Sequence, residues 1–362
     1  MHTVRIKLKN NPYKVMIGSA IIGSLGDYAN KLKLGDAAYI ITNRRVKHYY
    51  GKPVAASLKR NGINFKFQAV PDSETSKSLK VAFEAIRKIT AYAKDKRVFV
   101  IALGGGVVGD LAGFVSSVYK RGVAYIQVPT TLLAQADSSI GGKTGVDLTE
   151  GKNLVGTFYQ PRLVCCDVAL LKTLSAKQIK NGLAEIIKCA VIKNRGLFVY
   201  LEKLLGGNVL LNPKQLERIL LPAITVKARI VEADEKEEKG LRTILNFGHT
   251  IGHAIEAAGR YRAYNHGEAV GLGMLVATDI SRRLGLITPA IQKRVSALIK
   301  SAGLPDKVRN VRMRDIISRH YRDKKFIGSQ NRFVLISGIG KAVVRKNIPL
   351  ALIKESIQKV IY

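Results

Sequence analysis

The sequence predicts an α/β amino-terminal domain with a mainly parallel sheet over residues 1–168, followed by a helical domain over residues 169–362. Two patterns lead to this fold class. Short β-rich runs alternate with amphipathic helical runs in the first part, which is typical of α/β domains. Later, strand-like runs nearly vanish and segments of helical periodicity follow one another, broken by glycine, asparagine and proline. A length of 362 residues with 47% hydrophobic composition gives each domain a core.

Segments rich in β-branched and aromatic residues predict the strands of the first domain. They are VRIKL (4–8), YKVMIG (13–18), AAYIITN (37–43), FKFQAV (65–70), RVFVIAL (97–103), VAYIQVP (123–129) and LVCCDV (163–168). Between them lie amphipathic stretches such as residues 78–95, which we expect to be helical. In the second domain, RFVLISGIGKAVVRK (332–346) predicts a hairpin around a glycine turn.

The net charge of +34 raises the question of a nucleic-acid partner, because a basic surface attracts polyanions. The lysines and arginines are dispersed, however, and no zinc-finger, RNP or KH pattern is present. We therefore expect no specific nucleic-acid partner and favour a small anionic substrate. The sequence has no signal-peptide or membrane-spanning pattern, and its three cysteines fit no disulfide framework. These features predict a cytoplasmic protein without a membrane partner.

A glycine-rich turn follows the strand at residues 97–103. Gly104, Gly106 and Gly109 have the G-x-G-x-x-G spacing that brings backbone amides at a helix start close to a pyrophosphate. The acidic residue that usually follows about 20 positions later is absent. The turn therefore indicates either an atypical dinucleotide site or only close helix–sheet packing. The glycine-rich segment 129–161, with Lys143 and Lys152, predicts an anion-binding loop or a solvated surface loop.

Three of the six histidines, His249, His253 and His266, lie close together in the sequence. His249 and His253 would share one helix face, but the glutamate of an HExxH motif is absent. Asn265 and Glu268 predict a capping box that places His266 in the first turn of the next helix. Three converging imidazoles favour a metal site over isolated structural histidines.

Glu185 is the candidate carboxylate for this site. It lies on a predicted helix that a capping box of Ser175 and Gln178 would start, and Lys188 follows it at i+3. We expect Leu183, Ile187 and Val191 to face the core. Glu185 and Lys188 could instead form a solvent-facing ion pair. Two histidines and one carboxylate are the ligand set expected of a catalytic zinc ion.

A series of motifs then identifies a family. The chain resembles 3-dehydroquinate synthase of the sugar phosphate cyclase family along nearly its whole length. The resemblance rests on PDSETSKSL, GGGVVGDLAGF, YKRG, VPTTLLAQADSSIGGKTGV, GKNLVGTFYQP, LAEIIK, LNFGHTIGHAIE, HGEAVGLGM and DKK, in this order. It implies an NAD-binding Rossmann-like α/β domain, a helical metal- and substrate-binding domain and a homodimer.

The resemblance also implies roles for individual residues. It assigns Glu185, His249 and His266 to zinc, with cobalt as an alternative ion, and turns His253 toward the substrate. It assigns to NAD Asn43, Glu74, Lys77, Gly105, Gly106, Val107, Asp110, Thr130, Thr131, Lys143, Lys152 and Thr173. It assigns to catalysis and substrate binding Asp137, Lys143, Lys188, Arg242, Asn246, His253, Asn153, Lys227, Lys325 and, across a dimer, Arg121.

The implied reaction converts 3-deoxy-D-arabino-heptulosonate 7-phosphate into 3-dehydroquinate and phosphate. We expect Arg242, with Lys227 beside it, to bind the substrate carboxylate. Two positions stay open, because either Glu237 or Glu238 could be the family's acidic residue and either Lys324 or Lys325 could contact substrate. The alternatives are another sugar phosphate cyclase and an NAD- and metal-dependent alcohol dehydrogenase.

Overall fold

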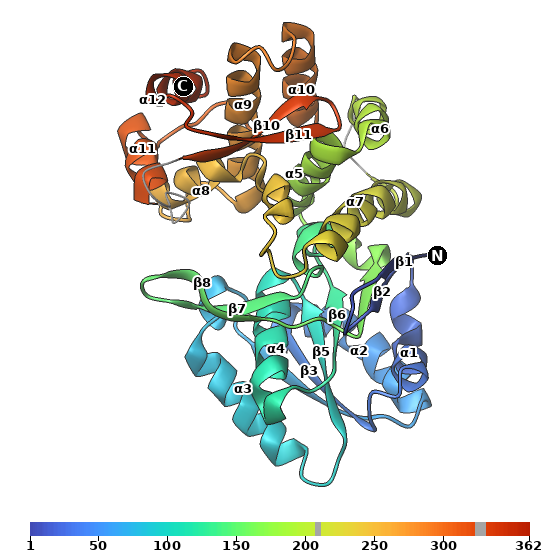
Figure 1. The fold of residues 1–362 in the computed structure, drawn as a ribbon. Helices are drawn as coiled ribbons and strands as arrows, with labels where there is room; N and C mark the ends of the chain where they lie inside the picture. The colour runs from blue at the N-terminus through green and yellow to red at the C-terminus, as the bar shows by residue number, and fades with distance from the viewer. Residues whose placement is uncertain (207–210, 323–330) are drawn as a thin grey trace. The chain divides into compact units, whose positions relative to one another are not determined.

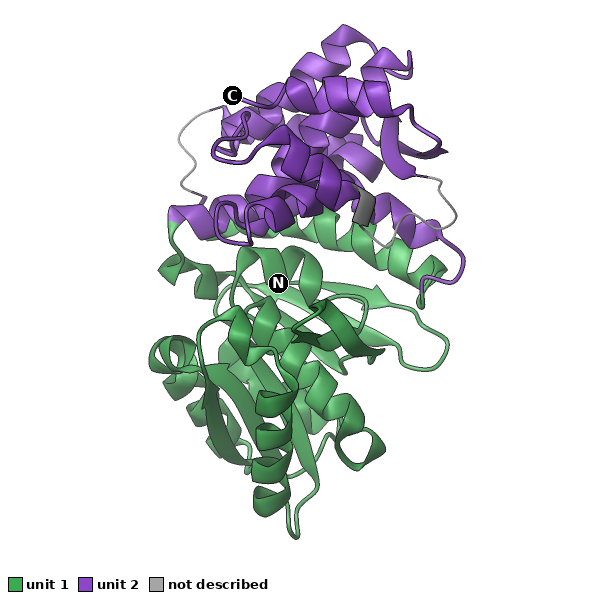
Figure 2. Ribbon diagram, turned by 90° about the vertical axis from the view of Figure 1, so that its left-hand side faces the viewer, with its two compact units in different colours: residues 1–175, 212–236 green, residues 176–211, 237–362 purple. Residues whose placement is uncertain are grey.

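The computed structural model describes residues 1–206, 211–322 and 331–362, and the chain forms two compact units (Figure 2). Unit 1 comprises residues 1–175 and 212–236, and unit 2 comprises residues 176–211 and 237–362. Residues 212–236, which we expected in the helical domain, thus group with the α/β part. The assignment of NAD binding to residues 1–168 and metal binding to residues 169–362 stays a prediction.

A seven-stranded sheet forms the centre of unit 1 (Figure 1), in the order β1-β2-β9-β6-β5-β3-β4. β1 and β2 pair antiparallel, whereas the other neighbours in the sheet pair parallel. Each of its strands corresponds to a predicted one, so the mainly parallel α/β fold is confirmed. The strands are β1 (His2–Ile6), β2 (Tyr13–Gly18), β3 (Ala37–Asn43), β4 (Asn64–Val70), β5 (Val98–Gly104), β6 (Tyr125–Pro129) and β9 (Leu163–Asp167).

Helices cover both faces of this sheet, and successive residues of a strand contribute to opposite cores. Ile40 of β3 packs in a cluster with residues of α1 (Leu25–Lys31) and α2 (Arg44–Arg60). Its neighbour Ile41 packs in a second cluster with residues of α3 (Leu79–Tyr92) and α4 (Gly106–Val118). Burial on both faces explains why these strands are nearly continuous apolar runs in the sequence.

The strand order reverses between β3 and β5, because β4 lies on the far side of β3 while β6 continues beyond β5. In such sheets, ligands bind outside the carboxyl ends of the strands at this switch point. β3 ends at Asn43, and β5 ends at Gly104. The topology therefore points to the glycine turn and Asn43 as the edges of one ligand site in unit 1.

Segment 129–161 contains more regular structure than the predicted loop. β7 (Lys143–Leu148) and β8 (Gly151–Phe158) form an antiparallel hairpin, and β7 packs on α4. The prediction of a loop over these residues was wrong, because Gly145 and Gly156 lie opposite each other in paired strands. They instead let the strands approach closely, since a Cβ atom on Gly145 would lie 2.7 Å from the carbonyl oxygen of Val155.

α7 (Pro213–Ala233) completes unit 1. It begins with a capping box of Asn212 and Gln215 and a proline at its first turn, and it packs against β1 and β2. Three short helical turns also belong to this unit: η1 (Ile21–Ser24), η2 (Glu74–Ser76) and η3 (Tyr119–Arg121). Two more follow β6 and β9, namely the π-helical turn η4 (Ala134–Ser138) and η5 (Val168–Thr173).

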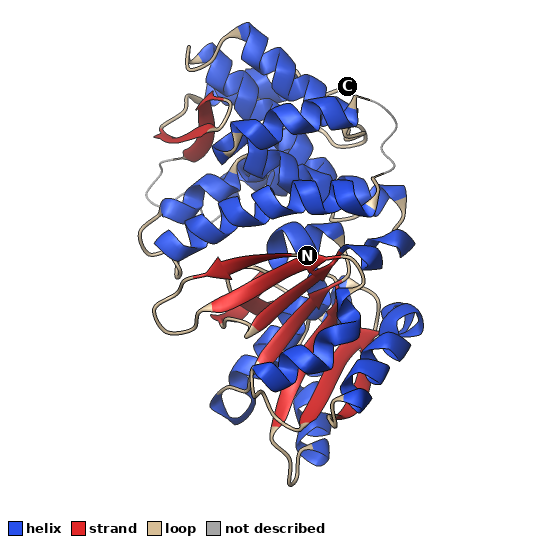
Figure 3. Cartoon of the chain, turned by 90° about the vertical axis from the view of Figure 1, so that its right-hand side faces the viewer, coloured by secondary structure: helices blue, strands red, loops and turns tan. Residues whose placement is uncertain are grey.

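Unit 2 is mainly helical (Figure 3), as predicted for the second half of the chain. The predicted hairpin is present as β10 (Arg332–Gly338) and β11 (Lys341–Lys346). The helices are α5 (Ala176–Lys193), α6 (Arg195–Leu205), η6 (Leu241–Asn246), α8 (His249–Ala258), α9 (His266–Arg283), α10 (Pro289–Ser301), α11 (Met313–Arg322) and α12 (Leu350–Gln358). Among the helices described in both units, none has the length and apolar character needed to cross a bilayer.

Candidate active site

Glu185 lies in the middle of α5, on its buried face. Its side chain is 1% exposed, and Leu183, Ile187 and Val191 around it are fully buried, as expected. The carboxylate oxygen Oε2 accepts a hydrogen bond from Nζ of Lys188, which is itself buried. The alternative of a solvent-facing ion pair is therefore wrong. A carboxylate held so deep needs partners, because an isolated buried charge is very costly.

The two other candidate ligands are the first residues of helices that pack on each other and, through α9, on α5. His249 starts α8 directly after Gly248, whose φ of 80° lies in the left-handed region. His266 starts α9, and the predicted capping box of Asn265 and Glu268 is present. The side-chain oxygen of Asn181 on α5 accepts a hydrogen bond from the amide of the following residue, Gly267. These contacts fix both histidines relative to Glu185.

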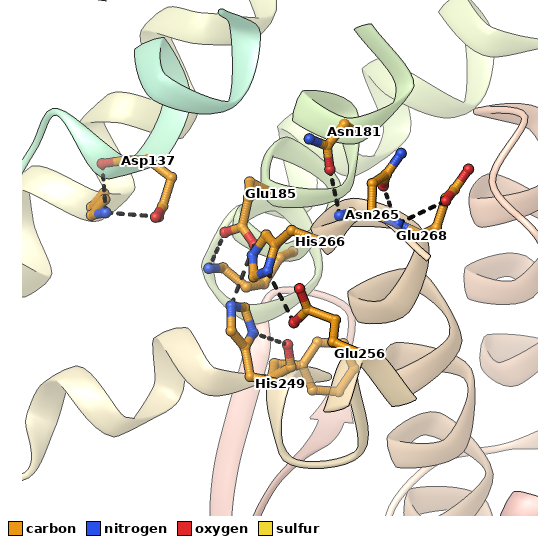
Figure 4. A network of polar contacts seen from close by, with 12 residues as sticks. Asp137, Asn181, Glu185, His249, Glu256, Asn265, His266 and Glu268 are labelled. Carbon is orange, nitrogen blue, oxygen red and sulfur yellow. Dashed lines mark hydrogen bonds and ion pairs between the residues drawn. The ribbon is translucent and has the colours of Figure 1, made fainter. Parts of the chain in front are cut away.

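The two histidine side chains converge on one carboxylate oxygen of Glu185 (Figure 4). Nε2 of His249 lies 3.4 Å from Oε1 of Glu185, and Nε2 of His266 lies 3.3 Å from the same atom. Ligand atoms about 2.0–2.1 Å from a tetrahedral zinc ion are roughly 3.3–3.4 Å apart. Nδ1 of His249 lies 3.2 Å from the carbonyl oxygen of Phe247, which leaves Nε2 for a metal. The residues therefore fit the ion that the sequence predicts.

The electrostatics of the cluster favour a cation. Burial alone would raise the pKa of Glu185, but Lys188 and His266 outweigh it and hold that pKa well below its usual value. Burial, with the charge of Lys188, holds the pKa of His249 well below 6.5, so this ring is neutral. Burial would also lower the pKa of His266, yet hydrogen bonds with Glu185 and Glu256 raise it to about 10. Glu185 and Glu256, which stabilise the protonated ring of His266, would also attract a metal ion.

His253 does not join His249 in this cluster, so the shared helix face alone would have misassigned the ligands. Its side chain is exposed, and the group of possible ligand atoms that contains Glu185 and His249 includes His266 and not His253. A second group that could bind a metal consists of His253, Glu256 and His266. Sequence reasoning missed Glu256, although its position three residues after His253 places both on one helix face.

In unit 1, the glycine turn forms the link between β5 and α4 that the sequence predicts. Gly105 precedes the first residue of α4, and no described side chain caps this helix start. The amide of Thr130 donates to the carbonyl oxygen of Gly104 at 2.9 Å, and a Cβ atom on Gly105 would lie 3.1 Å from Thr131. First-turn amides, including those of Gly106 and Val107, are thus available for a phosphate group.

A cluster around the buried Lys77 brings together two residues assigned to the cofactor and one assigned to the substrate. Lys77, which is 4% exposed, donates to Asp110 at 2.5 Å and to the side-chain oxygen of Asn153. Asp147 contributes as well, because its carboxylate accepts the amide hydrogen of Asn153 at 2.7 Å. No sequence pattern distinguishes Asp147 from other acidic residues of the chain. Lys152 and Glu74, both expected at the cofactor, lie 3.4 Å apart.

Asn43, at the end of β3, and Thr173, at the end of η5, form hydrogen bonds with different partners. The side-chain oxygen of Asn43 accepts the amide of Val46 at 2.7 Å and caps α2, while its amide nitrogen donates to Asp72 at 2.8 Å. The hydroxyl of Thr173 lies 2.8 Å from that of Tyr50. Their assignment to the cofactor stays a prediction.

Residues assigned to the substrate are found in both units. Nζ of Lys227 on α7 donates to Oδ1 of Asp137 at 2.7 Å within unit 1. Arg242 in unit 2 is buried, and its Nε lies 3.4 Å from Oε1 of Glu237. Because Lys227 and Arg242 belong to different units, their joint binding of one carboxylate stays a prediction. Of the two acids left open by the sequence, Glu237 is the one paired with Arg242.

The remaining assigned residues stay predictions. Lys143 begins β7, and Asn246 ends η6. Arg121 lies in η3, just beyond the carboxyl end of α4, about 20 Å from the glycine turn at the rise of an α-helix. Lys324 and Lys325 lie outside the described residues.

Comparison with known proteins agrees with this combination of fold and site. The chain superposes on 2-deoxy-scyllo-inosose synthase complexed with carbaglucose-6-phosphate, NAD+ and Co2+, with a TM-score of 0.90, 28% identity and coverage of 99% of this chain and 100% of that one. A 2-epi-5-epi-valiolone synthase from Streptomyces hygroscopicus with NAD+ and Zn2+ bound matches with a TM-score of 0.86 and 27% identity over 98% of both chains. An NADH-dependent butanol dehydrogenase from Thermotoga maritima, 14% identical with a TM-score of 0.69 and full coverage of both chains, shares the fold alone.

The two synthases define the class as that of the sugar phosphate cyclases. Family models described as 3-dehydroquinate synthase N-terminal and C-terminal match residues 67–181 and 182–326. The 3-dehydroquinate synthase of Desulforamulus reducens is 42% identical over 349 residues, which covers 96% of this chain and 97% of that protein. The chain belongs to the 3-dehydroquinate synthase family.

Proposed function

We propose that the chain converts 3-deoxy-D-arabino-heptulosonate 7-phosphate into 3-dehydroquinate and phosphate, as a carbon–oxygen lyase that uses NAD and zinc, with cobalt as a possible substitute. The convergence of Glu185, His249 and His266, in a chain whose two halves both match this family, carries the proposal. Relatives with known structures hold NAD+ together with Co2+ or Zn2+, which supports the choice of cofactors.

When bound, the two cofactors supply reversible hydride removal from a secondary alcohol and a Lewis acid that lowers the pKa of that alcohol. Glu185, His249 and His266 hold the metal. The exposed His253 contacts the substrate beside them, and Lys188 balances the charge of Glu185. In the elimination step, an oxygen of the leaving phosphate takes the proton from the carbon next to the ketone, the carbon–oxygen bond to the phosphate breaks, and a carbon–carbon double bond forms. Once the hydride has returned to the same carbon and the ring has opened, the chain holds the open sugar in the conformer from which an intramolecular aldol reaction closes the carbocycle.

The charged groups of the substrate have separate partners in the proposal. Arg242 presents a planar fork to the carboxylate, and Lys227, positioned by Asp137, adds a second cation. Lys143 and Asn153 bind the phosphate, with Arg121 reaching it from a second subunit and Lys325 completing the set. Asn246 contacts the substrate from the end of η6.

Unit 1 binds NAD in the proposal, at the switch point of its sheet. The supporting observations are the start of α4 without a side-chain cap, the glycine turn before it and the cluster around Lys77. A homodimer and a cytoplasmic location are parts of the same proposal. The three cysteines are buried and form no disulfide bonds, which suits a reducing compartment.

A phosphate-release assay on the heptulosonate phosphate tests this function. We expect phosphate and 3-dehydroquinate in equal amounts with no net NADH, and loss of turnover after chelation or removal of NAD. Net accumulation of NADH would instead identify an alcohol dehydrogenase. Equal turnover of an analogue without the carboxylate would identify a different sugar phosphate cyclase. Either result would reject the proposal.

A further inference from the structure

Glu256 is an acid beside the metal-ligand cluster that has no role in the reaction proposed above. It lies on α8, seven residues after His249, and its side chain is 12% exposed. Its Oε2 atom lies 3.5 Å from Nδ1 of His266 (Figure 4). The ring of His266 is thus placed between two carboxylates, because its Nε2 lies 3.3 Å from Oε1 of Glu185.

A neutral imidazole that binds a metal through one nitrogen carries its proton on the other nitrogen. The group that accepts a hydrogen bond from this N–H fixes the tautomer and the ring orientation. For His249, this acceptor is the carbonyl oxygen of Phe247, 3.2 Å from Nδ1. For His266, the corresponding group is the carboxylate of Glu256. Both rings then direct Nε2 at the same oxygen atom of Glu185.

The charges around the cluster explain why a carboxylate is useful at this position. Lys188 already neutralises Glu185, and the two imidazoles are uncharged when they bind a metal. A divalent cation would therefore be buried among groups with no net charge. Glu256 adds one negative charge close to the cation without occupying a ligand position.

We propose that Glu256 is a positioning residue, which holds His266 with Nδ1 protonated and Nε2 directed at the metal and thereby sets the affinity of the site for the ion. The inference rests on the metal role of the cluster in the proposed function. Glu256 also lies near His253, since ligand atoms of His253, Glu256 and His266 are all within 4.8 Å of one another. Metal affinity must therefore be measured separately from turnover.

The test compares Glu256→Gln and Glu256→Asp with a matched control, Glu268→Gln. Glu268 lies two residues after His266, but its carboxylate accepts the amide of Asn265 at 2.9 Å and lies 3.7 Å from Lys177. Glutamine preserves that cap while removing the same charge. Competition with a chromophoric chelator gives the Zn2+ and Co2+ affinities, and the absorption of bound Co2+ reports the ligand geometry. No substrate is present.

We expect Glu256→Gln to weaken metal binding about 10- to 100-fold and to change the Co2+ spectrum. Glu256→Asp should recover part of the affinity, and Glu268→Gln should stay within about twofold of the wild type. A Glu256→Gln chain with wild-type affinity would overturn the inference, even if its unfolding midpoint fell, because that pattern means a purely structural role. A wild-type chain that binds neither ion would overturn the proposed function as well. Failure of turnover alone would reject only the proposed function.

Discussion

Arg242 differs from most of the chain's many cations, because it is 3% exposed and pairs with Glu237 at 3.4 Å. Such a pair fixes the direction of the guanidinium while its planar fork can still recognise a carboxylate. The sequence could predict the need for a cation here through the family resemblance. It could not select Glu237 over Glu238, because adjacent residues of a loop carry no periodicity that separates them.

We predict that Arg242→Ala lowers kcat/KM for the heptulosonate phosphate by several orders of magnitude. Arg242→Lys should lower it about 100-fold, because lysine keeps the charge but loses the bidentate geometry. Steady-state phosphate release measures both. Arg312→Ala is the control, since this arginine forms a surface pair with Asp315 and is 68% exposed. Near-normal activity of Arg242→Ala would contradict the assignment of the carboxylate site.

Glu185, His249 and His266 could be selected from the sequence, and the structure brings them together. Residue types and helix starts suggested Glu185 and three histidines, and only the family resemblance separated His249 and His266 from His253. Glu256 could not be selected, because an acid three residues from a histidine on one helix face is also common on solvated surfaces. Only the tertiary packing of α8 on α9 distinguishes it.

At the scale of elements, the strands buried on both faces were predictable because their apolar runs leave few alternatives. The hairpin of β7 and β8 was not, because its exposed strand β8 carries glycines and polar residues that equally suit a loop. The sequence also did not predict that α7 belongs to unit 1. Its periodicity identifies a helix, but not the sheet edge on which that helix packs.

The turn before α8 depends on a residue without a side chain. Gly248 has φ 80°, and a Cβ atom there would lie 2.6 Å from Met274 and 2.8 Å from the carbonyl oxygen of Val270. We predict that Gly248→Ala lowers the free energy of unfolding by about 2–4 kcal/mol and displaces His249, so that metal affinity also falls. Urea unfolding and chelator competition measure the two effects.

Gly285→Ala is the control for backbone strain alone, because Gly285 has φ 69° and a Cβ atom there would meet nothing within 4 Å. It should cost roughly 1–2 kcal/mol and leave the metal affinity unchanged. Equal losses of stability in Gly248→Ala and Gly285→Ala, with unchanged metal affinity in both, would contradict the prediction. That result would mean that the close packing of α8 on α9 at Gly248 does not position His249.

Without metal, the free energy of unfolding of the whole molecule should depend on pH through His249 and His266. The pKa values of these two histidines are shifted in opposite directions. The pKa of His266 rises to about 10 in the folded chain, so its proton stabilises the fold fully below about pH 6.5, and this stabilisation is lost as pH rises toward 10. The pKa of His249 is lowered, so its stabilisation is present above about pH 6.5 and is lost as pH falls.

Urea unfolding in chelator between pH 5.5 and 9.5 tests this dependence, with pH values chosen around the ~6.5 reference. The destabilisation by His266→Gln should shrink as pH rises, by at most about 1.4 kcal/mol per pH unit. The destabilisation by His249→Gln should shrink as pH falls below about 6.5. With zinc present, the stabilisation by the ion should instead grow with pH, because binding displaces protons. The same trend for both variants would contradict the assignment.

The net charge of +34 makes a last prediction about the molecule as a whole. Its lysines and arginines are spread over both units, so a polyanion can make many weak contacts through its phosphates, and the sequence has no zinc-finger, RNP or KH pattern that would read bases. We predict nonspecific DNA binding at 50 mM salt that weakens by about 10³–10⁵ at 200 mM, as for a protein with roughly 6–10 phosphate contacts. Substrate turnover should change far less over the same range, because the buried Arg242 and Lys227 are screened much less than surface charges. Fluorescence anisotropy with two DNA sequences measures the first effect. Binding that survives 200 mM salt and prefers one sequence would mean that the basic surface has a specific partner.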